Sequence, residues 1–440
     1  MSRHVARRGF LKASAAFAAF GILPSGARAF SPSEKLRTAH IGVSGMGGAD
    51  LGSVSSHRSV EVAALCDVDL ENLEGAKRRH AGARTFRDYR ELFAAMGDSI
   101  DAVVVSTPDH THAPAAMTAL NHGKPVYCQK PLTHEVFEAR QLRLVAAKKK
   151  LPTQMGIQVH SSATYRRAVL MVQSGVIGKV REVHAWSFKN WGYDGGAFTG
   201  EHEVPARLDW NLWLGTVSER PFVPRVYHQA EWRKLIDFGT GTLGDMGVHI
   251  FDTPYAALEL TAPLRVKTTC RAPTGIGHPE KNIVEYRFPG TRYTTESLLW
   301  KWYDGASAPP RGADLGLPAG FELPDQGSLF VGEDGHLLLP HVGEARLFPE
   351  EKFRDAGRPK LDEVNHYHQW VDACRGEGKT SAGFDYAGPL TEALLLGVVA
   401  NRFPGVELRW DTEKLRVENV EEANALLRRK YRDRFAVDGL

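Results

Sequence analysis

The chain of 440 residues is long enough for two or three domains, and its 42% hydrophobic and 24% charged residues exclude wholesale disorder. Its 55 Lys and Arg nearly balance its 52 Asp and Glu, which gives a formal net charge of +3. A balance this even carries no strong signal for binding polyanions, so we expect no nucleic-acid partner.

The first 29 residues have the pattern of an export signal. The Arg7–Lys12 stretch contains a twin-arginine pair, an apolar stretch from Ala13 to Leu23 follows, and Ala27–Ala29 is an A-x-A cleavage signal. The apolar stretch is too short to span a bilayer, and a disordered basic N-terminus is the alternative. The pattern predicts recognition by the twin-arginine export machinery, a mature chain that starts near Phe30, and a periplasmic or exported location.

The four cysteines are far apart and form no CxxC pair: Cys66, Cys128, Cys270 and Cys374. Export and an even number would permit disulfides. Cys66 and Cys128, however, fall in predicted buried strands, where a free cysteine behaves as a small apolar residue. We therefore expect four structural thiols.

Residues 35–155 alternate between apolar strand runs and helical stretches. The predicted strands are Thr38–Val43, Val60–Cys66, Ile100–Ser106 and Pro125–Cys128, and the predicted helices include Ala113–Asn121 and His134–Lys150. Continuous apolar strands are typical of a parallel sheet buried on both faces. The alternation predicts an α/β fold that begins with a doubly wound Rossmann domain.

Residues 156–440 have a different pattern and predict a second α/β domain with a largely open, mixed or antiparallel sheet. Alternating strands are expected within Val180–Phe188, Arg265–Ala272, Ile283–Phe288 and Thr294–Trp300, and as a hairpin of Ser328–Val331 with His336–Leu339 around a Gly-Glu-Asp-Gly turn. Helices are expected at Leu361–Cys374, Pro389–Asn401 and Val420–Arg432, and the Gly- and Pro-rich stretch Ala306–Gln326 is expected to be a surface loop.

A glycine-rich turn follows the first predicted strand. Gly42 and Gly47 fit the G-x-G-x-x-G pattern, whereas Ser44 replaces the middle glycine and Gly45 stands beside it. Such glycines let the backbone approach a pyrophosphate at a helix N-terminus. Asp67 lies 20 residues after Gly47, where a carboxylate accepts hydrogen bonds from ribose hydroxyls and repels a 2′-phosphate. The turn and Asp67 predict NAD(H) in preference to NADP, although Asp67 could simply end a strand.

The segment from Ser106 to His112 ends another buried strand and contains Pro108, His110 and His112. Ligands of such sheets bind beyond the carboxyl ends of the strands, so we expect this segment to line the cofactor. The H-x-H spacing could also indicate a metal pair. No further ligand cluster lies nearby in the sequence, and we predict no metal.

At Gln129-Lys130-Pro131 the chain resembles the Gfo/Idh/MocA family, which is named after glucose-fructose oxidoreductase and inositol dehydrogenase. That family has Glu-Lys-Pro here, with a lysine that faces substrate and nicotinamide; Gln129 departs from the pattern. The resemblance extends over Gln154–Gln158, Gly175–Val180 and the D-x-x-x-H segment within Gly241–His249. It implies a Rossmann domain followed by an α/β substrate domain, and oxidation of a sugar or cyclitol.

The D-x-x-x-H segment agrees with that chemistry. Asp245 and His249 are four residues apart and therefore share one face of a helix. Histidine is the usual base near neutral pH, and a nearby carboxylate can orient it and favour its charged form. We predict Lys130 and His249 as the acid/base pair with Asp245 orienting. The alternative is a helix carboxylate beside a packed histidine.

Further residues are assigned by residue type and by the resemblance. Aromatic faces stack on sugar rings, and Arg or His side chains bind hydroxyls. The predicted substrate-binding residues are Tyr165, Arg166, Trp191, Trp232 and Arg233. The predicted cofactor-binding residues are Gly42, Ser44, Gly45, Met46, Gly47, Asp67, Ser106, Pro108, His110, His112, Gln129, Lys130 and Gln158.

An exported NAD enzyme is expected to hold its cofactor tightly, because free NAD is scarce outside the cytoplasm. The favoured function is a dehydrogenase that acts on a secondary hydroxyl of a sugar or cyclitol. An NAD-dependent glycosidase, which oxidises, eliminates and reduces in turn, is the first alternative, and a non-catalytic sugar-binding protein is the second. An exposed face of the second sheet would also suit a homo-oligomer.

Overall fold

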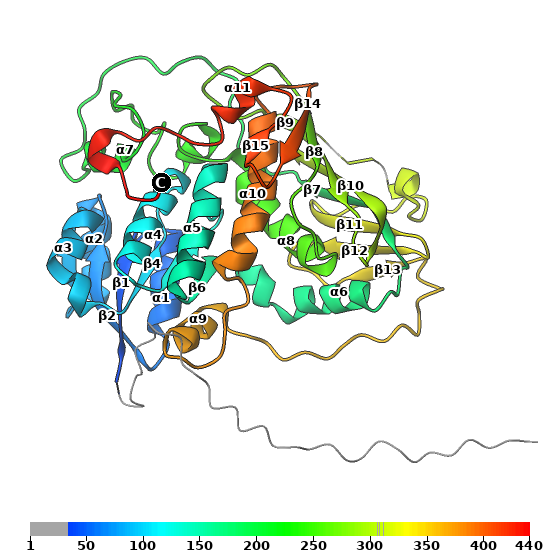
Figure 1. The fold of residues 1–440 in the computed structure, drawn as a ribbon, viewed down its shortest axis with the longest axis horizontal. Coiled ribbons are helices and arrows are strands. Elements are labelled where there is room, and N and C mark those ends of the chain that lie inside the picture. Colours follow the sequence, from blue (N-terminus) through cyan, green and yellow to red (C-terminus); the bar gives the residue numbers. More distant parts are fainter. Residues whose placement is uncertain (1–33, 306, 308, 311) are drawn as a thin grey trace, which may run out of the picture.

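The computed structural model describes residues 34–440 except 306, 308 and 311 (Figure 1). The twin-arginine pattern and the cleavage signal lie outside these residues. The first domain contains a sheet of six parallel strands in the order β3-β2-β1-β4-β5-β6. The strands are β1 (Leu36–Ile41), β2 (Val60–Cys66), β3 (Arg84–Phe86), β4 (Ala102–Val105), β5 (Val126–Gln129) and β6 (Thr153–Gly156). This is the predicted doubly wound sheet, and its strand order reverses between β1 and β4.

Helices cover both faces of this sheet: α1 (Met46–Ser55), α2 (Leu70–Arg79), α3 (Tyr89–Met96), α4 (His112–Asn121) and α5 (Val136–Lys149). Two of them begin at aspartates that cap free backbone N–H groups. Asp69 accepts from the Glu71 amide at the start of α2, and Asp88 accepts from the Arg90 amide at the start of α3. These caps fix the point at which the chain turns from strand to helix.

The second domain is built on a mixed sheet of nine strands in the order β13-β12-β11-β7-β10-β9-β8-β14-β15. The strands are β7 (Val180–Ser187), β8 (Arg265–Cys270), β9 (Lys281–Pro289), β10 (Thr294–Gly305), β11 (Gln326–Gly332), β12 (His336–Pro340), β13 (Arg346–Phe348), β14 (Glu407–Asp411) and β15 (Arg416–Val417). The predicted hairpin is present, because β11 and β12 pair antiparallel with Val331 opposite His336. Only the β7–β10 pair within this sheet is parallel.

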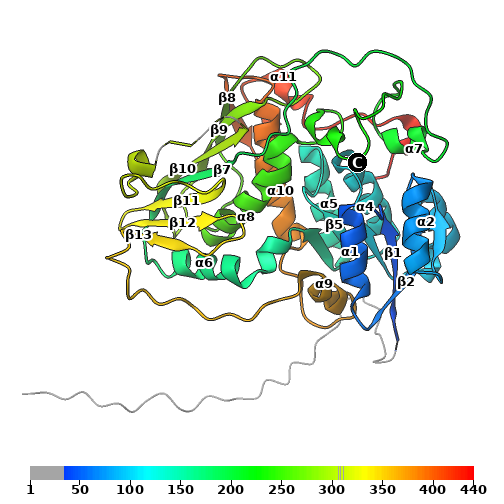
Figure 2. The same cartoon turned by 180° about the vertical axis from the view of Figure 1, so that it is seen from behind.

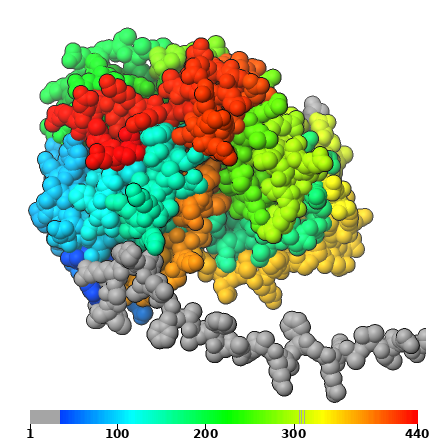
Figure 3. All heavy atoms as spheres, in the orientation of Figure 1, coloured from blue at the N-terminus to red at the C-terminus, as the bar shows by residue number. Residues whose placement is uncertain are grey.

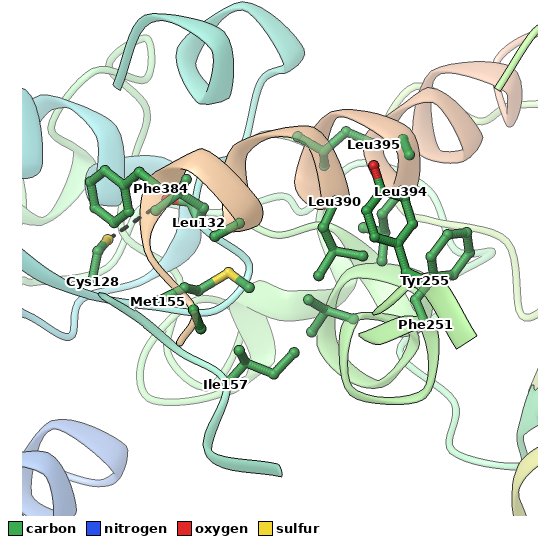
Figure 4. Close-up of a cluster of buried hydrophobic side chains, with 14 of the residues drawn as sticks. Cys128, Leu132, Met155, Ile157, Phe251, Tyr255, Phe384, Leu390, Leu394 and Leu395 are labelled. Carbon is green, nitrogen blue, oxygen red and sulfur yellow. Dashed lines mark hydrogen bonds between the residues drawn. The ribbon is translucent and has the colours of Figure 1, made fainter. Parts of the chain in front are cut away.

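One face of the second sheet carries helices α6 (Ala163–Gln173), α8 (Val248–Ala257) and α10 (Phe384–Ala400) (Figure 2). Helix α10 also packs against α5, so it joins the cores of the two domains. Figure 4 shows this junction, where Leu390 and Leu394 of α10 lie near Phe251 and Tyr255 of α8, and Met155 of β6 lies to their left. These side chains belong to one buried cluster, so the two domains share a core. Burying each such side chain stabilises the fold by roughly 1.5–3 kcal/mol.

The chain returns to the first domain after the second sheet. Helix α9 (His366–Cys374) packs beside α1, and its Trp370 and Val371 are buried with Leu36 and Tyr127 of the parallel sheet. The C-terminal residues lie over α4 and α5, beneath the segment 200–240 that is drawn in green (Figure 3). Segments far apart in the sequence therefore enclose the carboxyl edge of the parallel sheet.

Most predicted elements are present, with shifts of a few residues at their ends. The helix predicted at Val420–Arg432 is wrong, because only Glu421–Asn424 is helical. After Asn424 the chain follows an irregular path. There Arg428 donates a hydrogen bond to the Leu440 carbonyl, and Arg429 donates one to the Asp237 carbonyl. All four cysteines are free thiols. In the described part of the chain, no helix is both long and apolar enough to cross a membrane.

Candidate functional site

The glycine turn joins β1 to α1 at the point where the strand order reverses. Gly42 has φ +83°, and a Cβ there would lie 2.4 Å from the Ser106 carbonyl oxygen at the end of β4. A Cβ on Gly47 would lie 2.3 Å from the Gly42 carbonyl oxygen, and Gly45 has φ +52° at the start of α1. Only glycine fits these three positions. The turn thus presents backbone without side chains at a helix N-terminus, which fits a dinucleotide pyrophosphate.

Asp67 lies at the end of β2, beside this turn. Its carboxylate accepts hydrogen bonds from the Val43 amide at 3.1 Å and the Asp69 amide at 3.0 Å, and burial raises its pKa. Ser44 and Met46 are exposed next to it. A cavity of about 360 Å³ lies against the turn and is lined from α2 by Asn72, Gly75, Arg78 and Arg79. Asp67 therefore supports the turn, and its partial exposure leaves room for a ribose contact.

Gln129 belongs to a buried network behind the turn. Its amide nitrogen lies 2.9 and 3.0 Å from the two carboxylate oxygens of Asp50, a residue of α1 that has no exposed surface. Ser106 donates to the same carboxylate at 2.6 Å, and Tyr367 of α9 donates at 3.1 Å. Gln158 donates to the Tyr367 hydroxyl. Since a glutamate at 129 would place a second carboxylate against Asp50, the amide explains the departure from Glu-Lys-Pro.

The two histidines after β4 are buried, and their rings bind backbone. His110 donates to the Trp213 carbonyl at 3.0 Å, while the ring nitrogens of His112 lie 2.7 and 2.8 Å from the carbonyl oxygens of Thr107 and Pro131. Pro108 is half-buried at the start of this turn. The His112 ring thus links the ends of β4 and β5, whereas His110 links the turn after β4 to the backbone of Trp213, and its Nδ1 is buried without a hydrogen-bond partner among the described residues. Among the described residues, no cluster of three His, Cys, Asp or Glu side chains is arranged to hold a metal ion.

Lys130 follows β5 and meets Asp245 from the second domain. Its ammonium lies 2.8 Å from Oδ1 of Asp245 and 2.9 Å from the Asp245 carbonyl oxygen. The other carboxylate oxygen accepts from the Trp191 indole at 2.7 Å and from Lys189 at 3.2 Å, and Arg233 lies 3.5 Å from Oδ1. Burial would raise the pKa of Asp245, but the three cations outweigh it and hold that pKa well below its usual range.

His249 lies one turn beyond Asp245, where a π-helical turn at Leu243–Gly247 leads into α8. The expected orienting contact is not present: Asp245 binds Lys130, and Nδ1 of His249 has no hydrogen-bond partner among the described residues. The expected charged form is also not favoured, because burial and the Lys130 ammonium lower the pKa of His249 well below its ordinary value. The site therefore pairs a fixed ammonium with a neutral imidazole, which is able to accept a proton.

The predicted substrate-binding residues separate into two groups. Trp191 and Arg233 contact Asp245, whereas Tyr165 reaches the site through His341: its hydroxyl lies 2.8 Å from the His341 ring, which stands 5.7 Å from the His249 ring. Trp232 is buried in a separate apolar cluster, and Arg166 binds the Asp362 carbonyl at 2.8 Å. Trp232 therefore meets the group around Lys130 only through Arg233, whose guanidinium lies 4.4 Å from its ring centre, and Arg166 lies outside the group.

Sequence reasoning missed Lys189 and His341, which follow β7 and β12 and reach the site only through the sheet topology. It also missed a buried triad beside the site, in which Asp252 of α8 binds His160 at 2.8 Å and the Tyr386 hydroxyl at 2.7 Å. Asp252 stands three residues after His249, and this spacing was the one signal of the triad in the sequence.

The fold and the site define an NAD-binding oxidoreductase. Residues 36–157 match the model of the Gfo/Idh/MocA oxidoreductase family with NAD-binding Rossmann fold, and residues 164–278 match the model of that family's C-terminal α/β domain. Together the two matches cover more than half of the chain, and the chain belongs to this family.

The relatives are similar over part of their length. An inositol 2-dehydrogenase of Rhodococcus jostii is 32% identical over 158 residues, which are 35% of this chain and 42% of the relative. One from Rubrobacter xylanophilus is 34% identical over 113 residues, 25% of this chain and 31% of the relative. The chain thus spans less than half the length of the curated relatives it matches.

Solved structures match over most of both chains. The WlbA dehydrogenase of Chromobacterium violaceum, solved with NADH and UDP-GlcNAcA, has a TM-score of 0.62 at 16% identity, over 88% of this chain and 99% of that one. An inositol dehydrogenase homologue of Azotobacter vinelandii, solved with NADH and myo-inositol, has a TM-score of 0.57 at 17% identity, over 86% and 98%. At such identities the likeness establishes the shared fold.

Proposed function

We propose that this protein is an NAD-dependent dehydrogenase that oxidises a secondary hydroxyl of a sugar or cyclitol. The observation that carries the proposal is the meeting of Lys130, held by Asp245, with a neutral His249 at the carboxyl edge of the NAD-binding sheet. The inositol dehydrogenases among its relatives support the class of substrate.

Each residue has a distinct role in this proposal. Bound NAD⁺ supplies the acceptor for a hydride from the carbinol carbon. His249 accepts the hydroxyl proton, because its lowered pKa keeps the imidazole neutral. Lys130 donates a hydrogen bond to the oxygen that becomes the carbonyl. Asp245 fixes the direction of the Lys130 ammonium through Oδ1 and the backbone carbonyl.

We infer that the cofactor is held tightly, as an exported enzyme requires. The segment 204–240 lies across the end of β2, where it pairs Leu208 with Asp69 and the Asp209 amide with the Val68 carbonyl at 3.0 Å. The buried Asp69 carboxylate binds Arg207 and His228 of that segment, and Gln229 lines the cavity beside the glycine turn. Arg432 of the C-terminal segment binds the Gly215 carbonyl at 2.8 Å and so anchors the segment 204–240 in this position.

Mass spectrometry of purified, then denatured, protein tests this retention. We expect a nicotinamide cofactor to co-purify, and Arg207→Met to release it during purification, whereas the control Arg265→Met on the second sheet retains it. Protein isolated from the periplasm would test the proposed twin-arginine export, with Arg7→Lys/Arg8→Lys as the variant that stays inside. Size-exclusion chromatography would test a homo-oligomer through the second sheet.

Turnover is followed by the absorbance of the bound nicotinamide while sugars, cyclitols and glycosides are added. Net reduction by a free sugar or cyclitol supports the dehydrogenase. Release of a free sugar from a glycoside without net change of the cofactor would instead support the redox-assisted glycosidase. If no compound of this panel changes the nicotinamide absorbance although some of them bind the protein, the non-catalytic sugar-binding alternative is favoured.

A further inference from the structure

The site around Asp245 contains more positive than negative charge. Lys130, Lys189 and Arg233 each lie within 4.0 Å of a carboxylate, and in all three cases that carboxylate is Asp245. Among the described residues, no second Asp or Glu forms an ion pair with any of the three. Three cations thus share one carboxylate, which leaves the group with a net surplus of two positive charges.

Two of these cations have open hydrogen-bonding capacity. Arg233 reaches Asp245 only through Nε at 3.5 Å, and its terminal nitrogens have no hydrogen-bond partner in the described part of the chain. Lys189 has 47% of its side chain exposed and one carboxylate contact at 3.2 Å. Both charges lie 5.7 Å from the centre of the Trp191 ring, and the Arg233 guanidinium also lies 4.4 Å from the centre of the Trp232 ring. The two cations and the Trp191 indole therefore gather around the same carboxylate as Lys130.

The cofactor does not supply the missing negative charge. Its pyrophosphate belongs at the Gly42–Gly47 turn, at the end of β1, whereas these cations follow β5 and β7 or precede the π-helical turn. The oxidised nicotinamide ring is itself a cation, so its presence would add positive charge. The neutral His249 and His341 rings add none, because burial and then Lys130 lower the pKa of both.

We propose that the substrate is an anionic sugar whose negatively charged group is bound by Lys189 and Arg233 while Trp191 stacks on the ring. This rests on the proposed function and names its class of substrate. A guanidinium binds carboxylate or phosphate through two parallel N–H groups, and an adjacent ammonium adds a point charge. The shared chemistry is thus a carboxylate, as in a uronic acid, or a phosphate ester.

The experiment compares matched sets of sugars on the purified holoenzyme: glucose, glucuronate and glucose 6-phosphate, and the corresponding galactose and mannose sets. Two readouts are taken for each sugar, the absorbance of the bound nicotinamide and the shift in melting temperature. The variants are Lys189→Met and Arg233→Met. Lys301→Met and Arg265→Met, whose cations pair with Glu285 and Glu407 on the second sheet, are the controls.

We expect one charged member to have a kcat/KM at least tenfold above its neutral partner. Each variant should reduce that preference by about 10- to 100-fold, chiefly through KM, because a hydrogen bond to a charged group is lost. The controls should keep the preference. A larger preference for the uronates assigns a carboxylate, and one for the 6-phosphates assigns a phosphate ester.

Other results separate the two proposals. Equal or better turnover of the neutral member in every set overturns the anionic substrate and leaves the dehydrogenase standing. Stabilisation by the charged sugars that disappears in both variants, with no change in the nicotinamide, supports the anion site and counts against the dehydrogenase. If the charged sugars neither react nor stabilise better than the neutral ones, the anionic substrate is wrong.

Discussion

The Lys130 ammonium and the Asp245 carboxylate meet at 2.8 Å across 115 residues of chain, and the lysine also reaches the Asp245 backbone carbonyl. Lys130 directly follows strand β5 of the parallel sheet, and Asp245 lies in the π-helical turn before α8. The contact therefore forms only when the two domains dock correctly.

Replacing Lys130 by Ala should reduce turnover by about 100- to 10,000-fold while the cofactor stays bound, because a positioned acid/base group is lost. Asp245→Asn should reduce turnover as well, since the amide no longer fixes the ammonium. Nicotinamide absorbance measures turnover, and mass spectrometry measures cofactor content. Lys301→Met is the matched control, and turnover that is unchanged in Lys130→Ala would remove the lysine from the mechanism.

The pH profile of kcat/KM should report the His249 base. A base works when unprotonated, above its pKa, and burial together with Lys130 lowers the His249 pKa below its ordinary 6.5. Activity should therefore persist below pH 6.5 and fall only in more acidic solution. Lys189→Met removes one cation that contributes to this shift, so its acidic limb should move toward higher pH. A limb at or above pH 6.5 in the unmodified protein contradicts this assignment.

Asp67→Ala should weaken NAD binding and relax discrimination against NADP, because the carboxylate predicted to bind the ribose is lost. Isothermal titration of cofactor-free protein with both dinucleotides measures the change. The variant also removes two backbone contacts of the turn, so Asp67→Asn serves as the milder comparison. Tighter binding of NADP by the unmodified protein would instead direct attention to Arg78 and Arg79 in the cavity beside the turn.

Gln129→Glu tests the buried network. Two carboxylates would then share one site, and we expect a loss of about 1–3 kcal/mol in the free energy of unfolding at neutral pH, since the Asp50 acceptor loses a donor. The loss should shrink in acid, where one carboxyl group is protonated. Denaturant unfolding at several pH values checks this. A glutamate variant as stable as the parent at neutral pH would mean that the amide is not required.

Asp304 should make stability depend on pH. Burial raises its pKa to about 7, and its Oδ1 has no hydrogen-bond partner among the described residues. Between pH 4 and 7 the folded state binds the proton and the unfolded state does not, so stability falls as pH rises, by up to about 1.4 kcal/mol per pH unit. Asp304→Asn should remove this slope, whereas Asp355→Asn, on the surface, should keep it. Parallel curves for parent and Asp304→Asn would refute the assignment.

The sequence by itself determined the first domain and the family. Apolar strand runs, the glycines at 42, 45 and 47, and the spacing to Asp67 are local signals, because strand burial and turn geometry depend on neighbouring residues. The same locality made Lys130, Asp245 and His249 visible as candidates, each within a short motif. The helix expected at Val420–Arg432 was wrong: only Glu421–Asn424 is helical, and Arg428 and Arg429 bind the backbone of Leu440 and Asp237, contacts that no local pattern indicates.

Only the tertiary structure decided which side chains meet. It paired Asp245 with Lys130 instead of His249, used His112 to hold the ends of two strands together, and brought Lys189 and Arg233 from separate segments to one carboxylate. Ion pairs and hydrogen bonds act over a few ångströms in space, whereas sequence spacing specifies only neighbours along one helix or strand. The charge surplus at the site is therefore a property of the docked domains, and no single segment of the chain contains it.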